Sequence, residues 1–134
     1  MTECIFCKIA NGEIPAATIY EDEEFRVILD LGPASKGHCL ILPKSHYADL
    51  YELPEETAQK VMVLAKKIGT QLKEKLHCVG LNVVQNNGIT AGQTVFHFHL
   101  HLIPRYEGDH AVVEWTPGTL SEEDKEEIIS KFYV

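Results

Sequence analysis

Apolar and polar residues alternate along a short stretch in the C-terminal third of the chain, from His97 to Ile103. Three histidines occupy every second position there, and Phe98, Leu100 and Leu102 lie between them. A period of two is the period of a β-strand, so this strand would carry the imidazoles on one face and the apolar side chains on the other. Successive side chains on one face lie about 6.6 Å apart, so two imidazoles can reach one phosphate group.

Other segments predict the remaining elements. Strand-like stretches lie at 17–20, 24–31, 39–42 and 81–85, and turn-forming or acidic residues separate them. Apolar residues at helical spacing after Pro54 predict an amphipathic helix of about 20 residues. Residues 4–11 fit one or two helical turns, and Ser121 with Asp124 resembles a capping box that opens a last helix. Together these elements predict an α+β fold, with an antiparallel sheet of about five strands covered on one side.

Composition narrows the class of protein. The 134 residues fit a single domain, 1–134, with 45% hydrophobic and 24% charged residues. A net charge of −8 disfavours binding to a nucleic-acid backbone, and no apolar run approaches the ~20 residues that span a bilayer. The first residues show no secretion signal. We therefore expect a cytoplasmic protein with no nucleic-acid or membrane partner, whose four cysteines are thiols or metal ligands.

The alternating histidines admit three interpretations. They could lie on a solvated sheet face without a function, although histidine is seldom enriched in this way. As neutral imidazoles, they could hold a catalytic zinc ion that activates a water molecule. They could also supply a nucleophile, because an imidazole nitrogen can attack phosphorus and form a phosphoramidate.

The loop before the histidines favours the third interpretation. Gly88, Ala91 and Gly92 are small, so backbone N–H groups can approach anionic oxygens closely, and Thr94 adds a hydroxyl donor. Clustered imidazoles also disfavour one another's protonation, which keeps some of them neutral near neutral pH. A nucleophile must be neutral, so the sequence favours covalent catalysis at a phosphate.

The segment HFHLHLI, preceded by AGQTVF, resembles the histidine triad (HIT) family of nucleotide hydrolases and transferases. The similarity extends over residues 4–106 and includes the stretches IFCKI, LDLGP, KGHCLILPKSH and LNVVQNNG, whereas 107–134 is a variable C-terminal tail. The resemblance implies the HIT fold and a nucleotidyl group carried on a histidine. It also implies a homodimer whose two sheets join into one.

The resemblance also implies roles for individual residues. His99, the middle member of the triad, would attack the α-phosphate, and His101 would contact the phosphate and assist the leaving group. His97 completes the triad, His38 matches a fourth histidine that supports the site from behind, and Asp30 matches a carboxylate that binds the ribose hydroxyls. The residues implied around the base and the phosphate are Ile5, Phe6, Ile9, Leu31, Asn86, Gly92, Gln93, Thr94 and Val95.

Two features bear on the substrate. Asn86 and the KSH segment are more similar to the Hint branch, which hydrolyses nucleoside phosphoramidates, than to the dinucleoside polyphosphate branch. We therefore expect a purine nucleoside phosphoramidase-like hydrolase that acts on an AMP or GMP moiety. A dinucleoside polyphosphate hydrolase and a non-catalytic nucleotide-binding module are the alternatives. The 33 residues after His101 exceed the Hint pattern, so the tail bears on the choice of leaving group.

Cys4 and Cys7 form a C-x-x-C motif, which by itself fits a redox pair, half of a zinc site or two unrelated thiols. The resemblance extends to bacterial HIT proteins and galactose-1-phosphate uridylyltransferases that combine this motif with two histidines. It implies a structural zinc ion bound by Cys4, Cys7, His46 and His97, and no catalytic metal. His97 would then hold the N-terminal turn against the catalytic strand.

Overall fold

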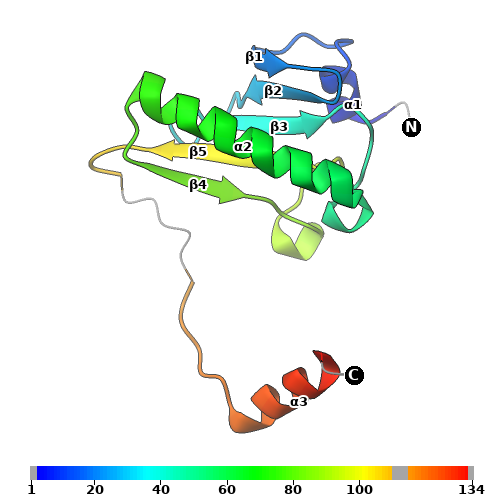
Figure 1. Cartoon of the computed structure of the whole chain (residues 1–134), viewed down its shortest axis with the longest axis vertical. Helices are drawn as coiled ribbons and strands as arrows, with labels where there is room; N and C mark the ends of the chain where they lie inside the picture. The colour runs from blue at the N-terminus through cyan, green and yellow to red at the C-terminus, as the bar shows by residue number, and fades with distance from the viewer. Residues whose placement is uncertain (1–2, 110–114, 133–134) are drawn as a thin grey trace.

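The computed structural model describes residues 3–109 and 115–132 (Figure 1). The elements are α1 (Ile5–Ala10), β1 (Thr18–Glu21), β2 (Phe25–Leu29), β3 (Cys39–Pro43), the 3-10 turn η1 (Leu50–Glu52), α2 (Glu55–Leu76), β4 (Gly80–Val84), the 3-10 turn η2 (Ile89–Ala91), β5 (Leu100–Arg105) and α3 (Glu122–Phe132). Five strands form one antiparallel sheet in the order β1-β2-β3-β5-β4. The predicted α+β fold is confirmed.

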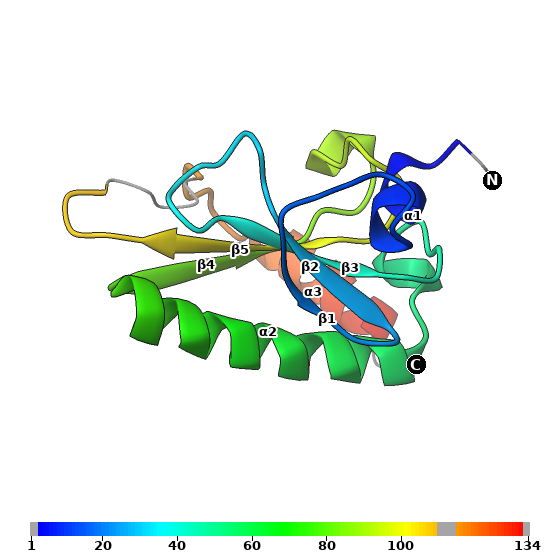
Figure 2. The ribbon, with the colours of Figure 1, turned by 90° about the horizontal axis from the view of Figure 1, so that it is seen from above.

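The long helix α2 covers one face of the sheet, whereas α1 and the connecting loops lie on the other face (Figure 2). Pro54 precedes the helix with extended backbone, and two glutamates occupy the first turn, where negative charge is favoured. The apolar stripe of α2 packs on the sheet. The core on this face includes Phe25, Val27, Ile41, Val61, Leu64, Ile68, Leu72, Phe98, Leu100 and Leu102.

A smaller apolar cluster holds α1 on the opposite face. Ile28, Leu40 and Leu42 alternate with the residues that face α2, as the strand period requires, and they pack against Ala10 and Phe6. His101 pairs with Leu40 across the β3–β5 ladder. Side chains that are paired directly across an antiparallel ladder share a face, so His101 lies on the side of α1.

The strand that carries the triad differs from its predicted extent, 97–103. β5 begins at Leu100, so His97 and His99 lie in the segment before it, and the predicted start of the strand at His97 is wrong. The alternation does hold for the apolar residues, which are buried against α2. β5 also continues through Pro104, which pairs with β4 beyond the last β3 partner, Cys39. A proline that lacks an N–H is tolerated there, because β5 has a neighbour on only one side.

The C-terminal helix α3 begins as predicted. The Asp124 backbone N–H donates to Ser121 Oγ at 3.1 Å, which caps the first turn. No residue of α3 is buried, and Ile128, Ile129 and Phe132 are exposed. Figure 1 shows α3 apart from the sheet. None of the helices in the described ranges is long and apolar enough to span a membrane.

Candidate active site and metal centre

A cavity of about 450 Å³ opens on the side of the sheet that carries α1. Its walls come from α1, from the ends of β2 and β3, from the loop before β5 and from the triad segment. The sequence-predicted residues that line it are Phe6, Asp30, Leu31, Asn86, Gly92, Thr94, Val95, His99 and His101. Ile5, Ile9 and Gln93 do not line it, and His38 and His97 lie beside it.

His99 has one ring nitrogen fixed by the main chain. Its Nδ1 lies 2.7 Å from the carbonyl oxygen of His97. A carbonyl can only accept, so Nδ1 carries the proton and Nε2 keeps its lone pair. Burial lowers the pKa of His99, which favours the neutral ring. The geometry therefore leaves Nε2 as a nucleophilic atom in the wall of the cavity.

His38 and His101 form a second hydrogen-bonded pair. The Ala34 N–H donates to His38 Nδ1 at 2.9 Å, so the proton of a neutral His38 resides on Nε2. That nitrogen lies 3.0 Å from His101 Nδ1 and 3.5 Å from Asp30 Oδ2. Donation to His101 leaves the His101 proton on its own Nε2. Burial, with His99 and His38 nearby, lowers the pKa of His101 to about 4.

Asp30 is held by the loop that follows β2. Its Oδ1 accepts the Gly32 N–H at 2.8 Å, and its own N–H donates to the carbonyl of His38 at 3.0 Å. The carboxylate thus has a fixed orientation at the cavity wall and retains acceptor capacity for hydroxyl groups. Leu31 beside it also lines the cavity and is 92% exposed.

Gln93 departs from its predicted role as a substrate contact. It is 4% exposed, and its Oε1 accepts the Gly88 N–H at 2.8 Å. Its Nε2 donates to the carbonyls of Ala48 and Val95, at 2.6 and 3.1 Å. The side chain therefore supports the loop from within, and Thr94 and Val95 face the cavity on its surface. The sequence pattern gave no signal for this, because the partner at Ala48 is remote along the chain.

Gly92 brings this loop close to Asn86. Its φ is +99°, a backbone conformation that L side chains rarely adopt. A Cβ atom there would lie 3.7 Å from Asn86 Nδ2. That distance is an ordinary van der Waals contact, so the backbone conformation is what requires glycine at this position.

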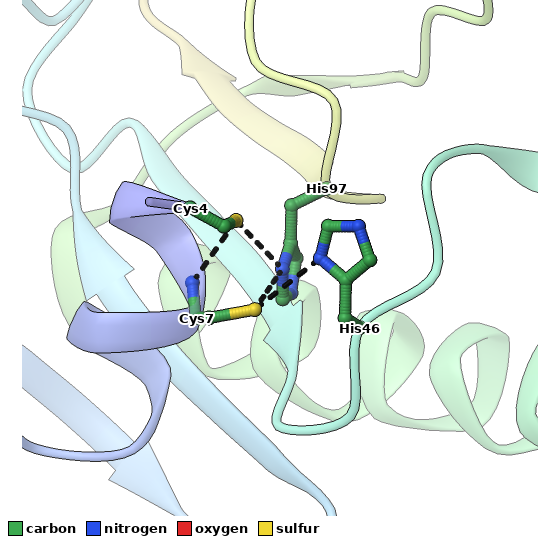
Figure 3. Close-up of side chains that lie close together, drawn as sticks. All are labelled: Cys4, Cys7, His46 and His97. Atoms are coloured by element: carbon green, nitrogen blue, oxygen red, sulfur yellow. Dashed lines mark hydrogen bonds between the residues drawn. The ribbon is translucent and has the colours of Figure 1, made fainter. Parts of the chain in front are cut away.

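Cys4, Cys7, His46 and His97 form a compact cluster at the N-terminus of α1 (Figure 3). Their four ligand atoms lie within 4.8 Å of one another. The Cys7 Sγ lies 3.2 Å from His46 Nδ1 and 3.4 Å from His97 Nδ1, and the Cys4 Sγ lies 3.5 Å from His97 Nδ1. Figure 3 shows the side chains pointing toward one another from α1, from the loop after β3 and from the segment before β5.

The cluster is compatible with a zinc site. Zn–S bonds of about 2.3 Å and Zn–N bonds of about 2.0 Å put tetrahedral sulfur and nitrogen neighbours about 3.5 Å apart, close to the distances between these side chains. His97 Nε2 donates to the Pro43 carbonyl at 2.8 Å, which leaves its Nδ1 lone pair directed at the cysteines. Burial, together with Cys4, raises the pKa of Cys7 to about 11, so a nearby cation would be needed to hold Cys7 as a thiolate.

The triad does not form a metal site by itself. Both ring nitrogens of His97 face the cysteines and Pro43, outside the cavity, so His97 cannot share an ion with His99 and His101. Asp30, His38 and His101 form the other close group of possible ligands in the described residues. His38 Nε2 carries a proton there and offers no lone pair. The geometry thus disfavours the alternative of a zinc ion held by the triad.

Comparison with known proteins gives consistent matches. The family model described as HIT domain matches residues 11–108. An uncharacterized HIT-like protein of Methanocaldococcus jannaschii is 47% identical over 96% of this chain and 97% of its own. The adenosine 5'-monophosphoramidase hnt1 of Schizosaccharomyces pombe is 38% identical over 96% of this chain and 97% of its own. The crystal structure of a Zn-bound histidine triad family protein from Mycobacterium smegmatis superposes with a TM-score of 0.79 and 42% identity, over 87% of this chain and 85% of that one.

Proposed function

Because the chain belongs to the histidine triad (HIT) family, we propose that it is a nucleotide hydrolase acting at the α-phosphorus of purine nucleoside phosphoramidates. The observation that carries the proposal is the state of His99. Its Nδ1 is committed to the His97 carbonyl, and its Nε2 lone pair lies beside the loop that ends at Thr94 and Val95. The similarity to a fungal adenosine 5'-monophosphoramidase supports this substrate class.

The proposed reaction proceeds in two displacements. His99 Nε2 attacks the α-phosphorus, the P–N bond to the leaving amine breaks, and the nucleotidyl group is held on the imidazole. The His97 carbonyl, which accepts from Nδ1, stabilises the positive charge that develops on that ring. Water then attacks the same phosphorus from the cavity, which releases a nucleoside monophosphate and restores His99.

The leaving amine must gain a proton as the P–N bond breaks. His101 is placed to supply this proton from Nε2. Its ring centroid lies 5.1 Å from that of His99, and its Nδ1 is hydrogen-bonded to His38. An anionic phosphate bound beside His101 raises the proton affinity of the imidazole. His101 then relays a proton from solvent to the leaving nitrogen, and Asp30 orients the nucleoside through the ribose hydroxyls.

The test is intact-protein mass spectrometry after brief incubation with an adenosine phosphoramidate. The wild type should carry a nucleotidyl adduct and accumulate AMP, whereas His99→Ala should do neither. His77→Asn is the matched histidine control, because His77 is exposed and has a φ of 60°, which asparagine tolerates. Near-normal turnover by His99→Ala would refute the mechanism.

The same assay separates the alternatives. Faster cleavage of diadenosine tetraphosphate than of the phosphoramidate would assign the chain to the dinucleoside polyphosphate branch. Binding of AMP without turnover of either compound would favour the non-catalytic module. Hydrolysis at His99 of the phosphoramidate alone would support the proposed substrate class.

We also propose that the partner is a second copy of this chain. β4 is an edge strand, and a hollow of about 700 Å³ with mainly apolar walls lies between β4 and α2. Met62, Val63 and Val83 are 58%, 69% and 45% exposed on this surface. Val63→Asp should convert a dimer to a monomer in light scattering coupled to size-exclusion chromatography. Ile19→Asp, on the opposite edge strand, should leave the dimer intact, and a monomeric wild type would refute the proposal.

A further inference from the structure

One residue joins the metal cluster to the nucleophile. The His97 side chain lies 3.4 Å from Cys7 Sγ and 3.5 Å from Cys4 Sγ, and its other nitrogen is fixed on Pro43. The main-chain carbonyl of the same residue accepts the hydrogen bond from His99 Nδ1. The contacts of the imidazole thus anchor the residue whose carbonyl sets the His99 tautomer, and a shift of the His97 main chain would move that acceptor.

Phe6 makes a second connection. It lies between the two cysteines in α1, and its ring meets both histidines edge-on. The centroid distances are 6.2 Å to His97 and 4.9 Å to His99, with interplanar angles of 79° and 90°. Edge-to-face contacts of this kind are favourable and directional. The turn that would bind the metal thus also supports the side of the His99 ring.

The loop that carries His46 makes a third connection. The Tyr47 carbonyl accepts the Phe98 N–H at 2.6 Å, and the Ala48 carbonyl accepts from Gln93 Nε2 at 2.6 Å. Residues 47–48, which follow the metal ligand His46, are therefore hydrogen-bonded both to the residue before His99 and to the loop 88–95, here called the phosphate-side loop. Cross-linking of α1, this loop and His97 would connect the α1 wall of the cavity to the triad segment and, through Ala48, to Gln93 in the loop before it.

The N-terminal end of α1 has weaker protein contacts than its C-terminal end, where Ala10 packs on the sheet. The helix has six residues, which is too short to be stable by itself. Cys4 and Cys7 are only partly buried, and thiols form weak hydrogen bonds. A metal ion would replace these contacts with four strong bonds to three separate segments of the chain.

We propose that metal binding by Cys4, Cys7, His46 and His97 positions the nucleophile, with His97 and Phe6 as positioning residues that hold His99 in its Nδ1–H form. The proposal rests on the proposed function only for the identity of His99 as the nucleophile. The cluster is then more than a support for the fold, because its occupancy sets the fraction of molecules in which Nε2 is available for attack.

Nitrogen NMR of the histidine rings tests this directly. Zinc-loaded and chelator-treated protein, both labelled with 15N, are compared, and the His99 signals are assigned from His99→Ala. We expect a single Nδ1–H tautomer with zinc and averaged tautomers without it, while amide signals of α2 stay unchanged. Identical His99 signals in both samples, with zinc binding verified by metal analysis, would overturn the proposal.

Two variants extend the test to turnover. Cys7→Ser should lose zinc and the His99 signature, and kcat should fall by about 10-fold to 100-fold, because small displacements of a reacting group are costly. Cys78→Ala, which removes a buried thiol outside the cluster, should match the wild type in all three measurements.

Phe6→Leu keeps all four metal ligands, so it tests the proposal even if the cysteine variant fails to fold. It should still bind zinc but show partial averaging of the His99 tautomers and a lower kcat. An unchanged His99 signature in Phe6→Leu would remove Phe6 from the proposal. If the fixed tautomer is present with zinc and lost without it, but the zinc-loaded wild type neither forms a nucleotidyl adduct nor releases AMP, the proposed function fails and the positioning by metal stands.

Discussion

Replacement of Gln93 by leucine measures how much the hydrogen bonds of its side-chain amide stabilise the phosphate-side loop. Leucine has a similar volume but cannot form the three hydrogen bonds of the amide, so the Gly88 N–H and the carbonyls of Ala48 and Val95 lose their partner. Each buried polar group left unpaired costs about 1–3 kcal/mol. Water from the cavity can reach part of this loop, so we expect Gln93→Leu to lower the free energy of unfolding by about 2–4 kcal/mol.

Urea denaturation measures that loss, and phosphoramidate hydrolysis measures its effect on the site. Gln71→Leu is the matched control, because Gln71 is exposed on α2 and should change stability by less than about 0.5 kcal/mol. The kcat/KM of Gln93→Leu should fall, because Thr94 and Val95 lose their fixed position. If Gln93→Leu unfolds at the same urea concentration as Gln71→Leu, the reasoning about buried hydrogen bonds in this loop is refuted.

Two further predictions concern backbone strain and pH. Gly92→Ala should destabilise the protein by about 1–2 kcal/mol in urea, because its φ is +99°, whereas Gly118→Ala, which meets no neighbouring atom, should be neutral. The free energy of unfolding should fall as pH drops from about 6.5 toward about 4, because burial and neighbouring histidines lower the pKa of His101 to about 4 and the unfolded chain takes up protons first. Urea titrations across this range should give a smaller slope for His101→Gln.

Local side-chain patterns were sufficient to predict most of the fold. The continuous apolar run of β3, which is buried along its whole length, and the helical spacing of apolar residues in α2 both follow from burial, and burial can be read from the sequence. The pattern failed at His97, where the alternation continues but the chain leaves the sheet. The cause is long-range, since Pro43 and the cysteines of α1 bind the imidazole. Periodicity contains no information about such partners.

In the candidate site too, the sequence identified some residues correctly but could not reveal contacts made by groups distant along the chain. Residue types and the family resemblance indicated Asp30, His99 and His101, and the structure places all three at one cavity. The family resemblance assigned Gln93 to the phosphate side of the site, but its amide turns inward to main-chain groups that include the distant carbonyl of Ala48. The role of a buried polar side chain depends on which groups are left without partners around it, and only the folded chain defines those groups.

Three histidines spaced two residues apart acquire different chemistry because each has a different partner on one nitrogen. The Pro43 carbonyl fixes the proton of His97 on Nε2 and frees Nδ1 for a metal. The His97 carbonyl fixes the proton of His99 on Nδ1 and frees Nε2 for attack. His38 donates to His101 Nδ1 and so keeps a proton on the far nitrogen. Under the proposed function, these single hydrogen bonds would make one side chain a metal ligand, one the nucleophile and one a proton donor, and a change in any one partner should alter the function of one histidine without changing the sequence of the triad.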